Sequence, residues 1–129
     1  MSTSCQIQFR VKYAKGYKHR NIYAHWDGYP ENKVPMLKEF IKWNKERMYD
    51  LEYCAANYIY WAKDRNCEYL TGYGIGLNNK LYDYIDYFYR VTSYCDSEII
   101  IEVYEVHNLP KEKKSIKYYK LLDTIKIKQ

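Results

Sequence analysis

The chain of 129 residues has the length of one domain, since single domains usually hold about 100 to 200 residues. Hydrophobic residues make up 47 % of it and charged residues 29 %, with only 5 Gly and 3 Pro, which excludes collagen-like, low-complexity and wholly disordered chains. The whole net charge of +5 lies in residues 111–129, where seven lysines outnumber Glu112 and Asp123. We therefore expect a single globular domain over residues 1–110 and a Lys-rich C-terminal tail over residues 111–129.

The N-terminal residues predict a β-hairpin. Residues 5–13 alternate without interruption between apolar and polar side chains, which is typical of a strand with one buried face. The polar stretch 14–20 then turns the chain, and residues 21–26 alternate again. Two such strands joined by a short polar connection favour an antiparallel pair.

Two amphipathic helices are predicted after the hairpin. The segment 27–30, with the sequence DGYP, combines two turn dipeptides and ends the second strand. Apolar residues between positions 34 and 48 recur at helical spacing, and Asn32 suits the N-cap of this helix. Asp50 is expected to cap a second helix that extends to about Asn66.

Period-two patterning returns in the C-terminal half. Residues 72–77 alternate between glycine and larger side chains, and residues 84–91 and 98–106 are rich in β-forming residues. The segment 118–127 fits either a last helix or an edge strand. The order ββααβββ predicts an α+β domain, with an antiparallel sheet of about five strands and two helices packed on one of its faces.

The segment from Tyr23 to Pro30 holds the densest group of chemistry-bearing side chains. Because His25 and Asp27 lie two apart at the end of a predicted strand, they are expected on one face, opposite Trp26. A His-x-Asp pair is able to hold a metal ion or to exchange protons, whereas in the structural interpretation Asp27 begins a turn. No third ligand is evident, so we predict neither a metal site nor a catalytic residue. The binding candidates of this segment are Tyr23, His25, Trp26, Asp27 and Tyr29.

The same residues carry a resemblance to known proteins. The motif Y-x-H-W-D-G-Y-P, formed by Tyr23, His25, Trp26, Asp27, Gly28, Tyr29 and Pro30, resembles that of a family of short, uncharacterised proteins of prokaryotes and of their viruses and mobile elements. The similarity continues through LKEFIKWN, YCAANYIYW, GYGIG and IDYFYRV, and so covers most of the chain. It implies a stable small fold with a preserved loop. The genomes that carry such proteins further imply action on a host cytosolic partner, either a defence component or its signalling nucleotide.

Alternate glycines mark a second binding candidate. Gly72, Gly74 and Gly76 do not form a dinucleotide-binding fingerprint, because no helix follows them. On a strand they would leave one face bare, and either a ring or a ligand could lie there. The rings considered for this place are Trp26, Trp43 and Trp61. We therefore include these three glycines, with Trp43 and Trp61, among the binding candidates.

Cysteine usage and hydropathy indicate where the protein is located. Cys5, Cys54, Cys67 and Cys95 form no CxxC pair and have no histidine at zinc-finger spacing, so we interpret them as reduced thiols and predict no cofactor. The N-terminus has no apolar signal segment, and the longest apolar run, 58–62, is too short to span a membrane. We expect a cytoplasmic protein with no membrane contact.

The aromatic composition favours binding over catalysis. The chain holds 18 Tyr against 3 Phe and 3 Trp, and Tyr and Trp are frequent hot-spot residues at interfaces. We therefore predict a non-enzymatic binding module for a host protein or a small nucleotide ligand, and a homo-oligomer is compatible with this function. The alternative is a nucleic-acid-binding protein that uses the Lys-rich tail and stacks bases on surface tyrosines. Its low arginine content favours weak, salt-labile nucleic-acid binding at most.

Overall fold

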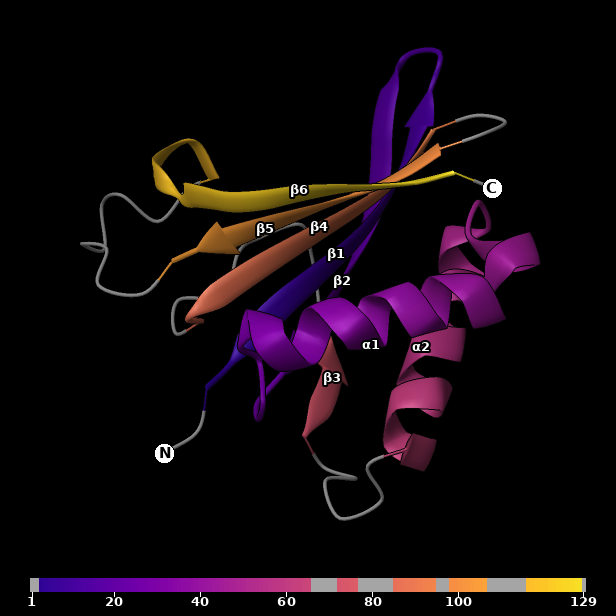
Figure 1. Ribbon diagram of the computed structural model, residues 1–129. Helices are drawn as coiled ribbons and strands as arrows, with labels where there is room; N and C mark the ends of the chain where they lie inside the picture. The colour runs from indigo at the N-terminus through magenta and orange to yellow at the C-terminus, as the bar shows by residue number, and fades with distance from the viewer. Residues whose placement is uncertain (1–2, 66–71, 77–84, 95–97, 107–115, 129) are drawn as a thin grey trace.

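The computed structural model describes residues 3–65, 72–76, 85–94, 98–106 and 116–128. They form one twisted sheet with two helices on the same side of it (Figure 1), in agreement with the predicted α+β class. No helix in this part of the chain is both long and apolar enough to cross a membrane. The elements are β1 (Cys5–Tyr13), β2 (Gly16–Ala24), α1 (Pro30–Trp43), the 3₁₀ turn η1 (Lys45–Arg47), α2 (Leu51–Arg65), β3 (Tyr73–Ile75), β4 (Tyr87–Tyr94), β5 (Glu98–Glu105), the 3₁₀ turn η4 (Ile116–Tyr118) and β6 (Lys120–Lys128).

The sheet has the strand order β3-β2-β1-β4-β5-β6. All neighbours pair antiparallel except β1 and β4, which run parallel. The predicted antiparallel sheet of about five strands is therefore wrong, because six strands are described and one pairing is parallel. A parallel pair needs a long crossover, and here the chain passes through β2, both helices and β3 before β4 returns beside β1. Periodicity within a strand does not reveal which distant strand it pairs with.

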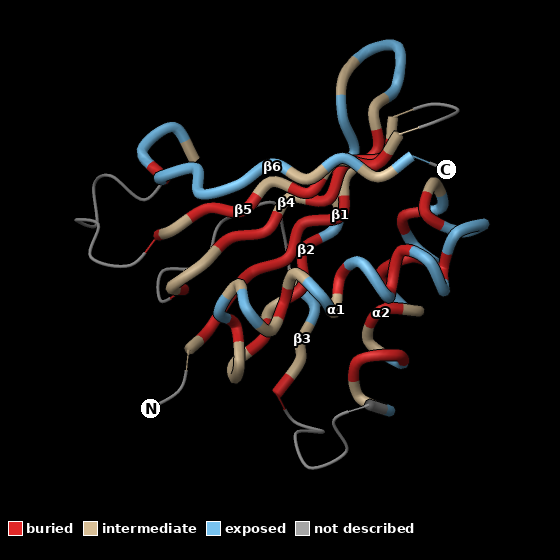
Figure 2. Tube along the Cα trace, viewed as in Figure 1, coloured by how far each residue is buried: buried red, intermediate tan, exposed pale blue. Residues whose placement is uncertain are grey.

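The main core lies between the helices and the sheet. The apolar row predicted on β1 is buried from Cys5 to Val11, as expected, whereas its last member, Tyr13, is exposed. Phe9 in this row contacts Phe40 of α1 and Tyr58 of α2, with ring centroids 5.6 and 5.4 Å apart. Figure 2 shows the central strands largely buried and β6 largely exposed. The aromatic group fixes both helices on the same face of the sheet.

Helix α1 begins at Pro30 and has Tyr29 as its N-cap. Proline suits the first helical position, because its fixed φ is helical and its missing N–H would have no partner there. Asn32 lies inside the first turn, and its side-chain amide donates to the carbonyl of Asp27 at 2.8 Å. The prediction of Asn32 as the N-cap is therefore wrong.

The C-terminal segment forms the outer strand β6. It pairs antiparallel with β5, which decides between the two predicted alternatives in favour of a strand. Ile125 and Ile127 pack against the main core, while the rest of the strand is exposed. Residues 111–115 of the predicted tail lie outside the described residues.

A second, smaller apolar cluster lies on the opposite face of the sheet. Phe88 is at its centre, with its ring centroid 5.9 Å from that of Tyr104 and 5.8 Å from that of Tyr119. The buried members are Ile85, Phe88, Tyr104, Val106 and Tyr119. This cluster covers one end of the face that the helices leave uncovered.

Candidate functional site

Polar side chains gather in the middle of the sheet face opposite the helices, which we call the open face. On β1 they alternate with the apolar row of the core, because successive side chains of a strand point to opposite faces. Neither described helix lies on the open face (Figure 1). The residues that form this open-face cluster are Gln6, Gln8 and Arg10 of β1, His19 and Asn21 of β2, Arg90 and Thr92 of β4, and Glu102 of β5.

Strand register brings the members of the open-face cluster together. One row across the sheet is Asn21, Gln8, Arg90 and Glu102, and the next row is His19, Arg10 and Thr92. Side chains directly opposite one another on adjacent antiparallel strands have Cβ atoms about 5 Å apart. The parallel pairing of β1 with β4 thus places Arg90 beside Gln8, although 82 residues separate them in the sequence.

Three amide side chains form the buried floor of the cluster. Gln6 and Gln8 both donate to the side-chain oxygen of Asn21, at 2.8 and 3.3 Å, and all three residues are buried. The oxygen of Gln8 accepts a hydrogen bond from Nε of Arg90 at 3.1 Å. A buried network of this kind holds its members in fixed orientations. Arg90 is therefore positioned by the floor beneath it.

Glu102 is the carboxylate nearest to both guanidinium groups, since it lies opposite Arg90 in the strand register and within ion-pair distance of Arg10. Nε of Arg10 donates to the hydroxyl of Thr92 at 2.9 Å, and Nη2 of Arg10 lies 4.0 Å from Oε1 of Glu102. The other oxygen of Glu102 accepts a hydrogen bond from Tyr104 at 2.7 Å. Glu102 is the only described carboxylate within 4.0 Å of either guanidinium, and the terminal nitrogens of Arg90 donate to no described group. The cluster therefore carries excess positive charge and unused N–H donors.

The pKa of the histidine in the cluster is lowered. Burial lowers the pKa of His19, and the positive charges of Arg90, Arg10 and Arg20 lower it further. Burial and the nearby Arg10 also lower the pKa of Arg90, while Glu102 opposes this shift. An added anion would relieve the repulsion between the two guanidinium groups. The electrostatics of the cluster thus favour a negatively charged ligand.

Tyrosines border the cluster toward the β1–β2 turn. The guanidinium carbon of Arg10 lies 3.8 Å from the centre of the Tyr17 ring, and the ammonium of Lys12 lies 4.6 Å from it. Burial raises the pKa of Tyr94, and a side-chain hydrogen bond with Tyr17 raises it further. Tyr17 remains 43 % exposed. The ring over which these two cations lie is therefore still partly accessible to a planar group.

The predicted motif forms a tightly packed loop around Gly28. The Gly28 N–H donates to the carbonyl of Thr3 at 2.8 Å, and its carbonyl accepts a hydrogen bond from Tyr89 at 2.6 Å. A Cβ atom on Gly28 would lie 2.9 Å from Cβ of Cys5 and from the Ser4 carbonyl carbon. Asp27 precedes it with φ of 55°, in the left-handed region. These close contacts leave no room for a side chain and explain why position 28 is a glycine.

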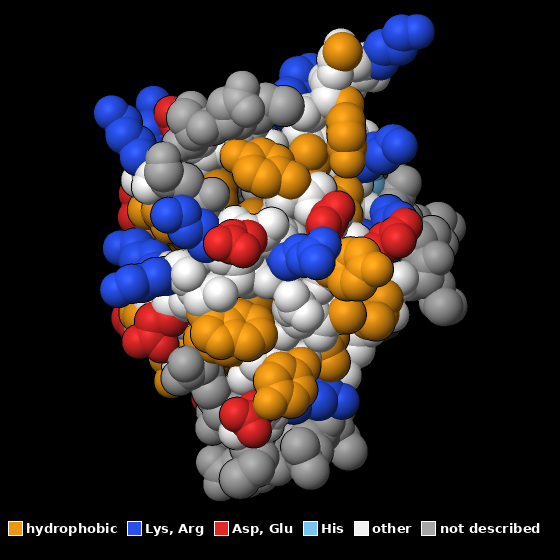
Figure 3. All heavy atoms as spheres, turned by 90° about the vertical axis from the view of Figure 1, so that its right-hand side faces the viewer, with side chains coloured by type: hydrophobic (Ala, Val, Ile, Leu, Met, Phe, Trp, Pro, Cys, Tyr) orange, Lys and Arg blue, Asp and Glu red, His pale blue; other side chains and the backbone are white. Residues whose placement is uncertain are grey.

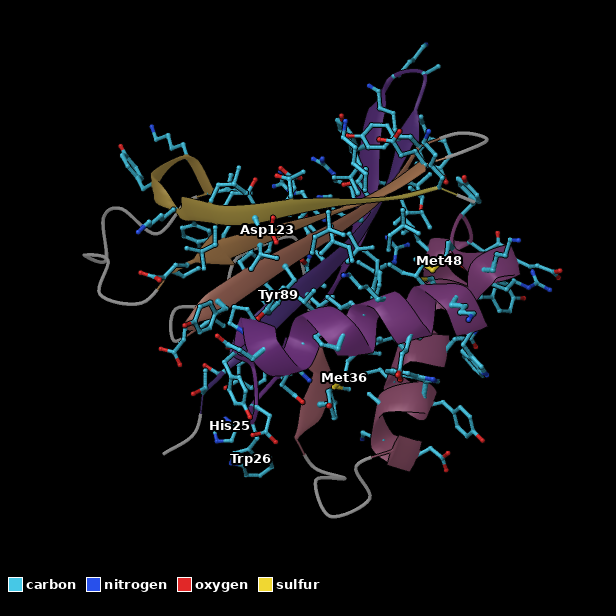
Figure 4. All side chains as sticks on the ribbon, viewed as in Figure 1. His25, Trp26, Met36, Met48, Tyr89 and Asp123 are labelled. Atoms are coloured by element: carbon cyan, nitrogen blue, oxygen red, sulfur yellow. The ribbon has the colours of Figure 1, made fainter. Side chains whose placement is uncertain are left out.

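The structure brings together only part of the predicted motif site. Figure 4 shows His25 and Trp26 side by side at the end of β2, with ring centroids 4.7 Å apart. The hydroxyl of Tyr23 lies 2.9 Å from Nδ1 of His25. Strand β2 ends at Ala24, so the strand alternation does not extend to Asp27, and no hydrogen bond joins Asp27 to His25. Tyr29, the last member, is exposed at the start of α1.

The alternate glycines have backbone roles beside β2. The Gly72 carbonyl accepts from the His25 N–H, and the Gly76 N–H donates to the Asn21 carbonyl, both at 2.8 Å. Gly74 lies between them in β3, and no described atom lies within 4 Å of a Cβ placed there. The expected ring is therefore not stacked on Gly74.

The two helix tryptophans lie away from these glycines. Trp61 is buried against Phe40, with ring centroids 5.6 Å apart, whereas Trp43 is 52 % exposed. With Tyr60 and Asp64 they line a hollow of about 530 Å³. Figure 3 views the side of the molecule where α2 and the end of α1 lie, and apolar side chains are scattered there among charged ones.

Sequence analysis missed the open-face cluster. Gln6, Gln8 and Arg10 form the polar side of an alternating strand, which normally faces solvent. One usable signal is the presence of two uncharged amides on that side of a strand whose other side is entirely apolar. The partner Arg90 has no such signal, because its position depends on the β1–β4 pairing.

The described cysteines are placed neither to bind a metal ion nor to act as nucleophiles. Cys5 and Cys54 are buried and unpaired, and burial raises the pKa of Cys5 to about 12 and that of Cys54 as well. Cys67 and Cys95 lie outside the described residues. Among the residues that the structure describes, no three His, Cys, Asp or Glu side chains gather as a metal-ligand set.

Comparison of the chain with protein-family models, with curated proteins and with solved structures found no match.

Proposed function

We propose that the protein is a non-enzymatic binding module whose open-face cluster binds a small anionic ligand of the nucleotide class. The observation that carries the proposal is the pair of guanidinium groups, Arg10 and Arg90, beside which Glu102 is the only described carboxylate: it lies 4.0 Å from Arg10 and opposite Arg90 in the strand register. Half-buried guanidinium groups with unused donors are well suited to phosphate oxygens, which accept paired charge-assisted hydrogen bonds.

The surroundings of the guanidinium pair fit the rest of a nucleotide. The Tyr17 ring and the Arg10 guanidinium that lies over it offer partly exposed planar groups beside which a base could pack, and the amides of Gln6 and Gln8 hold the floor of the cluster in place. Hydrogen bonds between the polar groups of the cluster hold them in fixed orientations. Fixed polar groups are suited to recognising a ligand. This supports binding over catalysis.

The motif resemblance extends the proposal to a biological setting. The similarity of residues 23–30 to proteins of viruses and mobile elements supports a host signalling nucleotide, or a defence component that carries one, as the partner in the host cytoplasm.

Titration calorimetry with defined probes tests the proposed function. We expect ADP and a cyclic adenine dinucleotide to bind, and uncharged adenosine to bind at least tenfold more weakly. Arg90→Gln should weaken ADP binding by about tenfold or more, since a hydrogen bond to a charged group contributes about 1.5–3 kcal/mol. The matched control is Arg47→Gln, because Arg47 pairs with Asp50 on the 3₁₀ turn after α1. Equal loss in both variants, or no binding of either nucleotide, would contradict the proposal.

A nucleic acid is the second candidate ligand. Its support is that Lys126 and Lys128 are exposed on β6, opposite Ile100 and Glu98 at the margin of the open face. For such a lysine strand we expect only non-specific affinity, with Kd on the order of 10⁻⁴ to 10⁻⁶ M at physiological salt. Titration of labelled duplex and single strands at two salt concentrations tests this. Nanomolar binding that survives the higher salt would replace the nucleotide proposal.

A further inference from the structure

Strand β6 presents a long edge at the outside of the sheet. It has nine residues, and on its outer side it pairs with no described strand. Only Ile125 and Ile127 are half-buried, and the other seven residues are exposed, as the pale strand in Figure 2 shows. The N–H and C=O groups on the outer side of such an edge form a template for another extended chain. Within β6, the N–H of Thr124 already donates to the Asp123 carboxylate at 2.8 Å.

A basic groove runs beside this edge, between α1 and β6. It has a volume of about 410 Å³, with Ile41 and Ile127 as its apolar part. Its other described lining residues are Lys38, Lys42 and Lys45 and, next to Ile127, Lys128, and none of the described lining residues is acidic. Residues 38, 42 and 45 are spaced to lie along one side of α1 and the turn that follows it. The groove therefore combines an apolar floor with a rim of positive charge.

A strand added to β6 would meet lysines on both of its faces. Because Ile125 and Ile127 point toward the helices, Lys126 between them points to the open face. The side chains of an added strand would alternate in the same way. One row would enter the groove under Lys38 and Lys42, and the other row would lie beside Lys126.

We propose that the β6 edge binds an acidic, extended segment of a partner protein as a seventh strand, with apolar side chains seated over Ile41 and Ile127. Main-chain hydrogen bonds to the edge supply affinity in this mode of recognition, and the alternating side chains supply specificity. Positive charge on both faces of the added strand makes Glu and Asp the complementary residues.

The lysines of β6 oppose pairing with a second copy of the chain. An antiparallel β6–β6 pair centred on Thr124 would place Lys120 directly opposite Lys128, and one centred on Asp123 would place Lys120 opposite Lys126. Like charges directly opposite on paired strands are destabilising. The same lysines that disfavour self-pairing favour an acidic partner.

The test uses a labelled ten-residue peptide of alternating valine and glutamate, titrated against the full chain by fluorescence anisotropy. We expect this peptide to bind, and a valine–lysine peptide of the same length not to bind. Lys38→Glu with Lys42→Glu should weaken binding at least tenfold. The matched control, Lys15→Glu in the exposed β1–β2 turn with Lys18→Glu on the exposed first part of β2, should not weaken it. Arg90→Gln should leave peptide affinity unchanged, which separates this site from the open-face cluster.

Amide hydrogen exchange then tests strand addition itself. We expect bound peptide to slow exchange in residues 120–128. Peptide binding without slower exchange there, or equal binding of the two peptides, would overturn the proposal. Tighter binding of a ten-nucleotide oligothymidylate would assign the groove to nucleic acid instead. Slowed exchange that depends on protein concentration without peptide would assign the edge to a second copy.

Discussion

At the scale of single residues, the loop after β2 depends on the absence of a side chain at Gly28. A methyl group there would lie 2.9 Å from backbone atoms of Thr3 and Ser4, which cannot rotate away. Gly28→Ala should lower the free energy of unfolding by about 1–3 kcal/mol, as overpacking does elsewhere. Urea denaturation measures the change.

Gly74→Ala is the matched control for Gly28→Ala. No described atom lies within 4 Å of a methyl at position 74, so its effect should stay within about 0.5 kcal/mol. Equal destabilisation by the two variants would mean that the loop at Gly28 is not packed as described.

Lys33 is a buried lysine whose described partners are the hydroxyl of Tyr73 and the sulfur of Met36. Its side chain is fully buried in α1, and its ammonium donates to the hydroxyl of Tyr73 at 3.1 Å. No described carboxylate lies within ion-pair distance of it. Tyr73→Phe should therefore cost about 1–3 kcal/mol of unfolding free energy, since a buried donor loses its oxygen partner.

A double-mutant cycle checks this dependence. In a Lys33→Met background the hydroxyl of Tyr73 has no ammonium to accept from, so Tyr73→Phe should be nearly neutral. Additive effects in the two backgrounds would show that Lys33 does not rely on Tyr73.

His19 makes stability depend on pH through the open-face cluster. Burial and three arginines lower its pKa in the folded chain, whereas the unfolded chain binds the proton near the ordinary value of about 6.5. The unfolded state then holds more protons below that pH, so the free energy of unfolding should fall as the pH drops through about 6.5. Denaturation of His19→Gln between about pH 7 and pH 5 should show a shallower decrease than the parent. A decrease as steep as the parent's, or an equal change in His25→Gln, would contradict this.

At the scale of elements, alternation predicted β1 well, because one of its faces is almost fully buried. The start of α1 was misplaced at Asn32, since a proline at the first helical position needs no side-chain cap before it. The C-terminal strand remained ambiguous because only Ile125 and Ile127 face the core. A strand with so few buried positions has a weak period-two signal.

Truncation after residue 115 tests how far β6 belongs to the fold. It removes Ile125 and Ile127 from the main core and buried Tyr119 from the second cluster. Burial of one large apolar side chain contributes about 1.5–3 kcal/mol, so the free energy of unfolding should fall by at least about 3 kcal/mol. Calorimetry should show a Tm lower by more than about 6 °C. The control Lys126→Gln with Lys128→Gln should leave Tm almost unchanged, and an unchanged Tm after truncation would show that β6 is dispensable.

At the scale of the whole molecule, the class of the fold was predictable and the site was not. Helical and strand periodicities identify which residues are buried, and this was enough for two helices on one face of a sheet. The open-face cluster instead depends on which strands are neighbours. Arg90 meets Gln8 only because β4 lies beside β1, and no local pattern encodes that pairing. The motif of residues 23–30 was visible because it is local, and its glycine is explained by packing.

The parallel pairing of β1 with β4 has a consequence for synthesis of the chain. Every other pair of neighbouring strands lies either within the group β1, β2 and β3 or within the group β4, β5 and β6. The β1–β4 pairing instead requires residues that lie more than 80 positions after their partners in the sequence. On the ribosome, one edge of β1 therefore stays open after β2 has paired with it, and open edges invite aggregation. Gln6, Gln8 and Arg10 make one face of the β1–β2 hairpin hydrophilic before β4 has been synthesised. The residues that form the cluster in the finished protein thus also make one face of the incomplete sheet polar.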